Sequence, residues 1–230
     1  MEIDIYRFLE DFQKIITETF GQDSPIIIIL LLVLVNLAII IFLFRQRKGM
    51  INKITAEKMN KSLMTSEIEA LNVYTYVIES NPQNTEAYFN RAMTKERLND
   101  FMGALKDYNK TIELNPYDSE SYFRRAHVKR QMNDYQGAAS DYTKVIELNP
   151  DYSTIYYNRG LAKGLLKDHI GAIEDYDKVL ELDPYNAFAF YNRGYSKILI
   201  DDRIGGCDDL REAAELGVPE ALEVIRYFCR

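Results

Sequence analysis

The strongest hydrophobic pattern in the chain is an uncharged run at residues 25–44, PIIIILLLVLVNLAIIIFLF, in which Asn36 is the one polar side chain. Twenty helical residues rise about 30 Å, which matches the hydrocarbon thickness of a bilayer. A helix in a soluble core would show a polar face, and this run has none. The pattern therefore predicts a single transmembrane helix at residues 25–44.

Basic residues are distributed unequally on the two sides of this run. Arg7 and Lys14 precede it, whereas six cations follow it at Arg45, Arg47, Lys48, Lys53, Lys58 and Lys61. Cytoplasmic flanks of membrane helices are enriched in Lys and Arg. We therefore expect the N-terminus outside, a basic juxtamembrane helix or linker at 45–64, and the rest of the chain in the cytoplasm.

The N-terminal segment 1–24 has an amphipathic stripe within residues 3–20. This stripe is typical of a helix that lies at the membrane interface. Docking on another membrane protein is equally compatible with it, because four acidic residues oppose adhesion to anionic lipid. Asn36 offers a second contact, since a mid-membrane amide can bond a partner helix or a second copy, or its own backbone.

A second pattern, with a period of 34 residues, occupies most of the remaining chain. The phrase YFNRA (88–92) returns as YFRRA (122–126), YYNRG (156–160) and FYNRG (190–194). Asn-Pro or Asp-Pro follows the same period at 81–82, 115–116, 149–150 and 183–184, and proline ends helices. Each period therefore holds two helices, as at 85–98 and 101–114.

Small residues mark where the two helices of a period approach each other. They are Ala92, Ala126, Gly160 and Gly194 on the first helices and Ala70, Ala104, Ala138, Ala172 and Gly206 on the second. Tyr74, Tyr108, Tyr142 and Tyr176 follow four residues later, with Leu210 in the last copy. This pattern resembles the tetratricopeptide repeat.

The resemblance implies an all-α fold, a right-handed α-solenoid of helix hairpins. We expect the array at 65–218, as a half repeat plus about four repeats. Residues 51–64 fit poorly as a further first helix, because Lys58 would occupy the close-contact position. Residues 219–230 suit a capping helix with Ala221, Leu222, Ile225 and Phe228 on its inner side.

Each first helix also carries an arginine, and an aspartate follows it 16 residues later. The pairs are Arg91 and Asp107, Arg125 and Asp141, Arg159 and Asp175, and Arg193 and Asp209. We interpret them as a structural ladder of charge-assisted hydrogen bonds. A row of arginines that binds phosphate or carboxylate ligands is the alternative.

The resemblance further implies a concave groove, lined by the first helices, that binds a peptide segment or helix of a protein partner. The groove positions are Phe89, Asn90, Met93, Arg97, Phe123, Arg124, His127, Arg130, Gln131, Tyr157, Asn158, Leu161, Tyr191, Asn192 and Tyr195. Rings bury apolar side chains and amides pair with peptide backbone. The cations at 97, 124, 127 and 130 suggest an acidic or C-terminal segment.

Composition excludes several other classes of function. A net charge of −7 argues against a nucleic-acid partner. Cys207 and Cys229 are too few for a disulfide framework, and we interpret both as small apolar residues in helices. His127 and His169 lie more than one period apart, and His169 is expected to pack between helices. We expect no catalytic site, no metal and no cofactor.

Two functions remain. The first is a membrane-anchored adaptor that binds a protein partner in its cytoplasmic groove. The second is a structural subunit of a larger membrane complex that packs through its repeats and transmembrane helix without a peptide ligand.

Overall fold

The computed structural model describes residues 14, 47, 49 and 61–229 of the chain. The predicted membrane helix at 25–44, the amphipathic stripe at 3–20, Asn36 and Lys58 lie outside the described residues. Within the described part, no helix combines the length and the apolar character that crossing a membrane requires. The chain divides into two units between Met64 and Thr65, and the second unit contains the helix hairpins.

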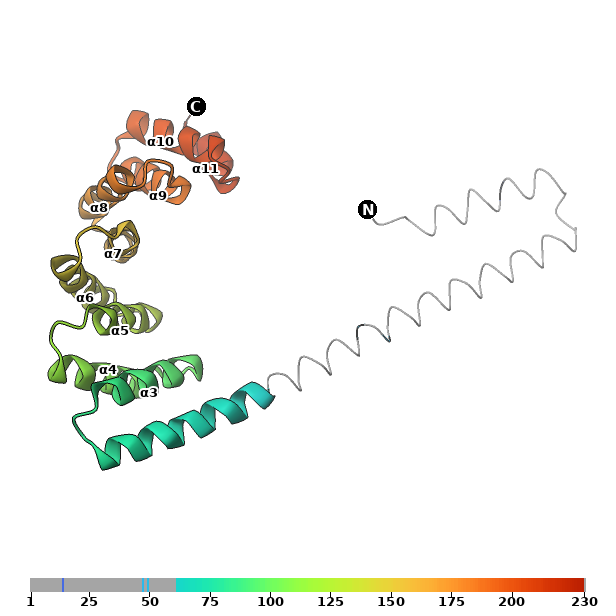
Figure 1. The fold of residues 1–230 in the computed structure, drawn as a ribbon. Coiled ribbons are helices and arrows are strands. Elements are labelled where there is room, and N and C mark those ends of the chain that lie inside the picture. The colour runs from blue at the N-terminus through green and yellow to red at the C-terminus, as the bar shows by residue number, and fades with distance from the viewer. Residues whose placement is uncertain (1–13, 15–46, 48, 50–60, 230) are drawn as a thin grey trace, which may run out of the picture. The chain divides into compact units, whose positions relative to one another are not determined.

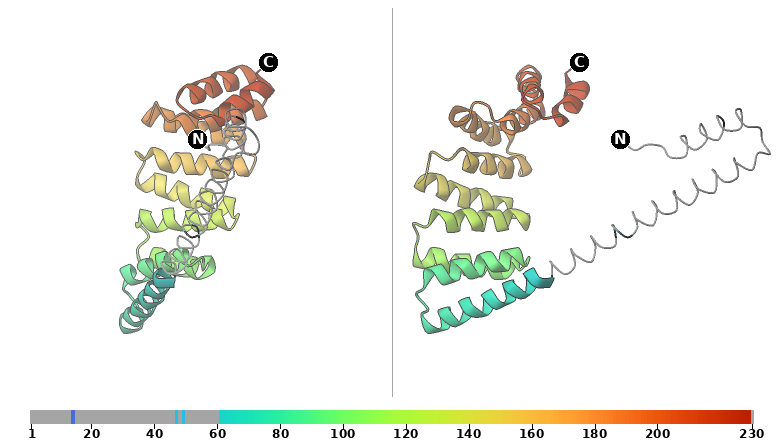
Figure 2. Two further views of the ribbon diagram at one scale, coloured as in Figure 1. Left: turned by 90° about the vertical axis from the view of Figure 1, so that its right-hand side faces the viewer. Right: turned by 45° about the vertical axis from the view of Figure 1, so that its right-hand side comes forward.

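The second unit is an array of helix hairpins (Figure 1). Residues 61–80 form a helix that precedes the first hairpin. The hairpins are α3 (Thr85–Arg97) with α4 (Phe101–Leu114), α5 (Ser119–Gln131) with α6 (Tyr135–Leu148), α7 (Ser153–Leu165) with α8 (His169–Leu182), and α9 (Ala187–Leu199) with α10 (Arg203–Glu215), followed by α11 (Glu220–Phe228). Figure 2 shows them stacked in sequence order. Residues 61–229 contain no strand, so the expected all-α solenoid is confirmed.

Three residues join the two helices of each hairpin, and the last two of them define the turn. The first of these two has a positive φ, at Asn99 (61°), Asn133 (62°), Lys167 (64°) and Asp201 (68°). The second is an aspartate whose carboxylate accepts a hydrogen bond from the amide of a glycine three residues later, as Asp100 does from Gly103 at 3.0 Å. A Cβ at Gly103 would collide with that carboxylate. The glycine is therefore required by the cap.

The predicted close contact between the helices of a hairpin is confirmed. Ala126 of α5 and Ala138 of α6 have no exposed surface, and Tyr142 is fully buried beside them in the same cluster. In the last hairpin a Cβ on Gly194 would lie 2.8 Å from the carbonyl oxygen of Gly206. Any larger side chain there would push the two backbones apart.

The C-terminal helix α11 covers the end of the array, as expected, but with a different face. Ala221 is buried, and Val224 and Ile225 pack on the cluster formed by α9 and α10. Leu222 and Phe228 are exposed, so their prediction as inner residues was wrong. The buried face of α11 is therefore turned about the helix axis relative to the predicted one, because the cluster contacts positions 221, 224 and 225.

The two cysteines differ from the sequence expectation. Cys207 of α10 and Cys229 at the end of α11 form a disulfide, with their Cα atoms 5.7 Å apart. The interpretation of both as unpaired apolar residues was therefore wrong. They are 22 residues apart in the chain, and only the packing of α11 on α10 brings them together.

Candidate functional site

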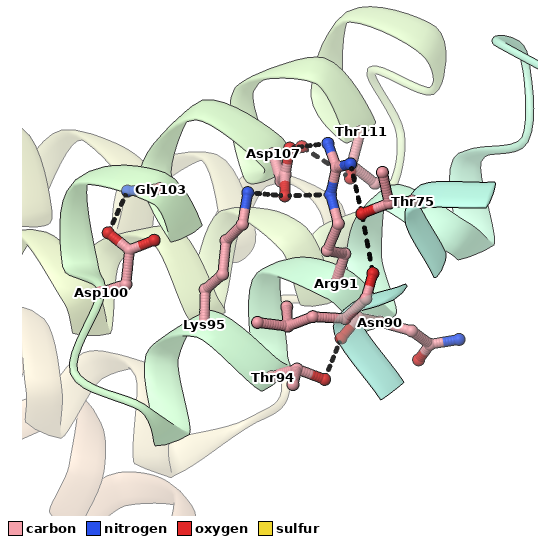
Figure 3. A network of polar contacts seen from close by, with 10 residues as sticks. Thr75, Asn90, Arg91, Thr94, Lys95, Asp100, Gly103, Asp107 and Thr111 are labelled. Carbon is pink, nitrogen blue, oxygen red and sulfur yellow. Dashed lines mark hydrogen bonds and ion pairs between the residues drawn. The ribbon is translucent and has the colours of Figure 1, made fainter. Parts of the chain in front are cut away.

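A ladder of buried charges lies inside the hairpins and holds the first helices in place. In the first hairpin, Arg91 donates from Nε and Nη2 to the two carboxylate oxygens of Asp107, at 2.8 Å each (Figure 3). Lys95 donates from Nζ to the same carboxylate at 2.7 Å. These bonds raise the pKa of Arg91. The guanidinium also lies 5.7 Å from the ring centre of Tyr88.

The same arrangement recurs in the next three hairpins, and the predicted pairs are all present. Each arginine also donates from Nη1 to a residue 16 positions earlier, on the preceding second helix: Thr75, Asn109, Thr143 or Asp177. The arginines therefore join adjacent repeats. Because the guanidinium groups of all four ladder arginines are paired with aspartates, the ladder interpretation is confirmed against the anion-binding row.

One component of the ladder escaped the sequence analysis. Lys95, Lys129, Lys163 and Lys197 each form an ion pair with the aspartate of their hairpin, at 2.7 to 3.0 Å. A signal for it exists, because a lysine follows each ladder arginine by four residues. Each buried aspartate therefore balances two cations.

All fifteen predicted groove residues lie on the first helices α3, α5, α7 and α9. Arg97, Gln131 and Tyr195 are exposed, and the other twelve are half-buried. Helices α7 and α9 contact each other directly. Asn192 of α9 donates to the hydroxyl of Tyr157 of α7 at 3.0 Å. The structure thus brings the residues of the third and fourth repeats together along one face.

The aromatic groove residues stand on the buried tyrosines below them. Ring centres of Phe89 and Tyr108 are 5.9 Å apart, those of Phe123 and Tyr142 are 6.0 Å apart, and those of Tyr157 and Tyr176 are 5.9 Å apart. Burial raises the pKa of Tyr157, so its hydroxyl stays neutral at physiological pH. Tyr191 differs, because it packs on the cluster of α10 and α11. The predicted groove residues Phe89, Phe123 and Tyr157 are therefore aromatic rings supported from beneath by a buried tyrosine.

The amides of this face are partly used by their own helices. Asn158 and Asn192 donate to the carbonyls of Thr154 and Phe188, both at 2.8 Å. Their side-chain oxygens have no hydrogen bond within the described residues. These oxygens can accept from the backbone N–H groups of a bound segment.

Three of the four predicted groove cations already have acidic partners. Arg97 forms two bonds of 2.8 Å with Glu67, and the pKa of Glu67 is lowered by them. Arg124 bonds Glu120 at 2.8 Å.

The third cation position is His127, whose Nδ1 lies 3.0 Å from Oε1 of Glu96. The carboxylate of Glu96 also accepts a hydrogen bond from the hydroxyl of Tyr108. At Arg130, the Nε atom is buried without a hydrogen-bond partner among the described residues. Because three of these four positions have acidic partners, they attract an acidic ligand less strongly than the sequence suggested.

Within the described residues, no three His, Cys, Asp or Glu side chains come together as metal ligands. His127 is on α5 and His169 begins α8. The face thus offers rings, amides and paired charges, which suit binding of a polypeptide.

This architecture defines an α-solenoid of stacked helix hairpins. Three family models, described as TPR repeat or tetratricopeptide repeat, match residues 73–106, 126–167 and 153–186. These segments are therefore similar to tetratricopeptide repeats. Comparison with curated protein sequences gives no match.

Solved structures of MamA are similar to the chain. One crystal structure of MamA has 23% identity and a TM-score of 0.61, covering 64% of this chain and 85% of that one. A second has 22% identity and a TM-score of 0.63, covering 68% and 86%. MamA 41-end from Desulfovibrio magneticus RS-1 has 22% identity and a TM-score of 0.61, covering 66% and 85%. At this identity the likeness concerns the fold.

Proposed function

We propose that the protein is a membrane-anchored adaptor whose tetratricopeptide repeats bind a segment of a protein partner along the first helices. The observation that carries this proposal is the aromatic row of the groove. Phe89, Phe123, Tyr157 and Tyr191 recur once per repeat and remain half-exposed. A rigid row of rings provides large contact area at a low cost in side-chain entropy.

The proposal is tested by removing two rings of the row. Full-length protein carrying Tyr157→Ala and Tyr191→Ala is expected to lose its partners in crosslinking from native membranes. The matched control is Tyr117→Ala with Tyr185→Ala, since these loop tyrosines are 82% and 80% exposed and lie outside the groove. Far-UV circular dichroism checks that both variants keep their helix content. Equal crosslinking by wild type and the groove variant would refute the proposal.

A specific observation favours the alternative of a structural subunit. Met102, Ile170 and Ile204 occupy the second position of three second helices, and each is at least 64% exposed. An apolar row outside the groove suits lateral packing in a larger complex. Ile170→Asp with Ile204→Asp would then disrupt the complex, whereas the groove variant would leave it intact.

We propose a cytoplasmic location for the repeats, on the strength of the basic residues that follow 25–44. The Cys207–Cys229 pair opposes this location, because disulfides persist mainly in oxidising compartments. The redox state of the pair in intact cells therefore tests the location. A cytoplasmic placement predicts that the pair is reduced in cells and is labelled by a membrane-permeant maleimide without prior reduction. A pair that reacts only after reduction would overturn the cytoplasmic placement.

A further inference from the structure

A hollow of about 190 Å³ lies in the groove where the third and fourth hairpins meet. Its apolar walls come from Leu161 and Leu165 of α7, Tyr176 of α8 and Tyr195 of α9. Two of these, Leu161 and Tyr195, are predicted groove residues. A segment bound along the first helices would therefore pass over the opening.

The hollow exists because one side chain is missing from the repeat. Gly164 takes the position that is Glu96 in the first hairpin, Arg130 in the second and Ile198 in the fourth. In the first hairpin, the carboxylate of Glu96 accepts a bond of 2.9 Å from the hydroxyl of Tyr108. In the third hairpin, a Cβ added to Gly164 would meet nothing within 4 Å. The space above Tyr176 is therefore open.

Several residues that line this space carry polar atoms without partners. His169 Nδ1 is buried and has no hydrogen-bond partner among the described residues. Tyr176 and Ser196 also line the hollow, and the hydroxyl of neither residue makes a hydrogen bond within residues 61–229. Burial raises the pKa of Tyr176, so its hydroxyl remains a donor at physiological pH. Buried polar atoms normally have partners, and here a ligand can supply them.

Size and chemistry together select the ligand. A cavity of about 150 Å³ is enough to bind a benzene molecule, so this hollow suits one aromatic ring. Its apolar walls fit the ring, and its unpaired atoms require a polar tip that both donates and accepts. A phenol has this combination, since its hydroxyl can donate to an imidazole nitrogen and accept from another hydroxyl.

We propose that the hollow is an anchor site for a tyrosine side chain of the bound protein segment. The proposal rests on the proposed function of the groove and adds the residue that the third and fourth repeats select. The tyrosine ring lies between Leu161, Leu165 and Tyr195. Its hydroxyl replaces the carboxylate that Glu96 provides in the first hairpin.

The two histidines of the chain allow a direct test on the full-length protein. Their ring signals are followed by NMR while N-acetyl-tyrosinamide is added at millimolar concentration. The signals of His169 are expected to shift, whereas those of His127, on α5 and bonded to Glu96, serve as an internal reference. N-acetyl-phenylalaninamide is expected to shift them less, and N-acetyl-alaninamide is expected to leave them unchanged.

Two substitutions at one position provide the matched variants. Gly164→Leu fills the hollow and is expected to abolish the shift of His169, whereas Gly164→Ala adds one methyl group in open space and is expected to retain it. An unchanged His169 in the wild type, or an equal response in Gly164→Leu, would overturn the proposal. An equal response to the phenylalanine probe would overturn the role of the polar tip. Dependence of the His169 signals on protein concentration would assign the occupant to an exposed tyrosine of a second copy and overturn a foreign partner.

The outcome is separable from that of the proposed function. If Gly164→Leu keeps the crosslinked partners while the Tyr157→Ala and Tyr191→Ala variant loses them, the groove stands and the anchor fails. If the tyrosine probe binds while both variants keep the partners, the hollow accepts tyrosine but the groove proposal fails.

Discussion

The charge ladder makes a quantitative prediction for Asp141→Asn. The Asp141 carboxylate is 4% exposed and receives two bonds from Arg125, at 2.8 and 2.6 Å, and one ion pair from Lys129 at 2.8 Å. Asparagine keeps the shape but removes the negative charge, so two cations lose the group that balances them. Breaking a buried ion pair on one side costs about 3–5 kcal/mol.

This cost is reduced because the two cations are partly in contact with solvent: the side chains of Arg125 and Lys129 are 16% and 20% exposed. Water therefore screens part of the uncompensated charge, and we expect a loss of about 2–3 kcal/mol in the free energy of unfolding. Urea titration followed by far-UV circular dichroism measures it. Hydrogen exchange in α5 and α6 shows whether the loss is local, since each repeat contacts only its neighbours.

The control for this prediction is Glu120→Gln. Its pair with Arg124 has side chains that are 52% and 40% exposed, and exposed pairs contribute about 0–1 kcal/mol. Adding Lys129→Met to Asp141→Asn removes one unbalanced cation and should recover part of the stability. A loss in Asp141→Asn no larger than in Glu120→Gln would refute the reasoning.

Three further predictions concern other parts of the array. Ala138→Leu forces extra carbon atoms against Ala126 and should cost about 1–3 kcal/mol or more; an unchanged urea midpoint would contradict the register. Lys167 has a φ of 64°, a conformation that strains any residue with a side chain. Lys167→Gly should therefore raise the free energy of unfolding by about 0.5–1 kcal/mol and shift the urea midpoint upward; a lower urea midpoint would contradict this. The bonds from Arg97 lower the pKa of Glu67 from 4.5, so this pair stabilises the fold above that pH and the stabilisation is lost as the pH falls through the lowered pKa. Unfolding titrations should therefore show the advantage of wild type over Glu67→Gln disappearing on acidification below pH 4.5; a constant difference would be the contrary result.

Local signals in the sequence determined most of the helix boundaries. Helices predicted at 85–98 and 101–114 are found at Thr85–Arg97 and Phe101–Leu114. Proline excludes helix after 81 and 115, and a capping aspartate starts each second helix. These effects act over a few residues, so they can be read without knowing the fold.

The repeat also predicted partners that lie far apart in the chain. Arg125 and Asp141 meet as expected because two antiparallel helices joined by three residues bring residues 16 apart to the same level. The sequence pattern did not predict the lysine that completes each site, although its spacing recurs in all four copies. Periodicity makes such contacts predictable wherever every repeat carries the same residue.

Positions where the repeats differ depended on the tertiary structure. The sequence shows Gly164 as one glycine among several, and only packing shows that its missing side chain opens a hollow beside Tyr176 and His169. The charges of Arg97 and His127 were visible, whereas their pairing with Glu67 and Glu96 required the neighbouring helices to be in place.

The sequence by itself thus determined the stacked hairpins and their internal ladder, because propensity, capping and a strict period act locally and repeat identically. Tertiary structure alone decided the face of α11, the Cys207–Cys229 bond and the open space above Tyr176. Each of these depends on how closely particular side chains of different hairpins fill the volume between them, and that volume is defined only once the hairpins have packed.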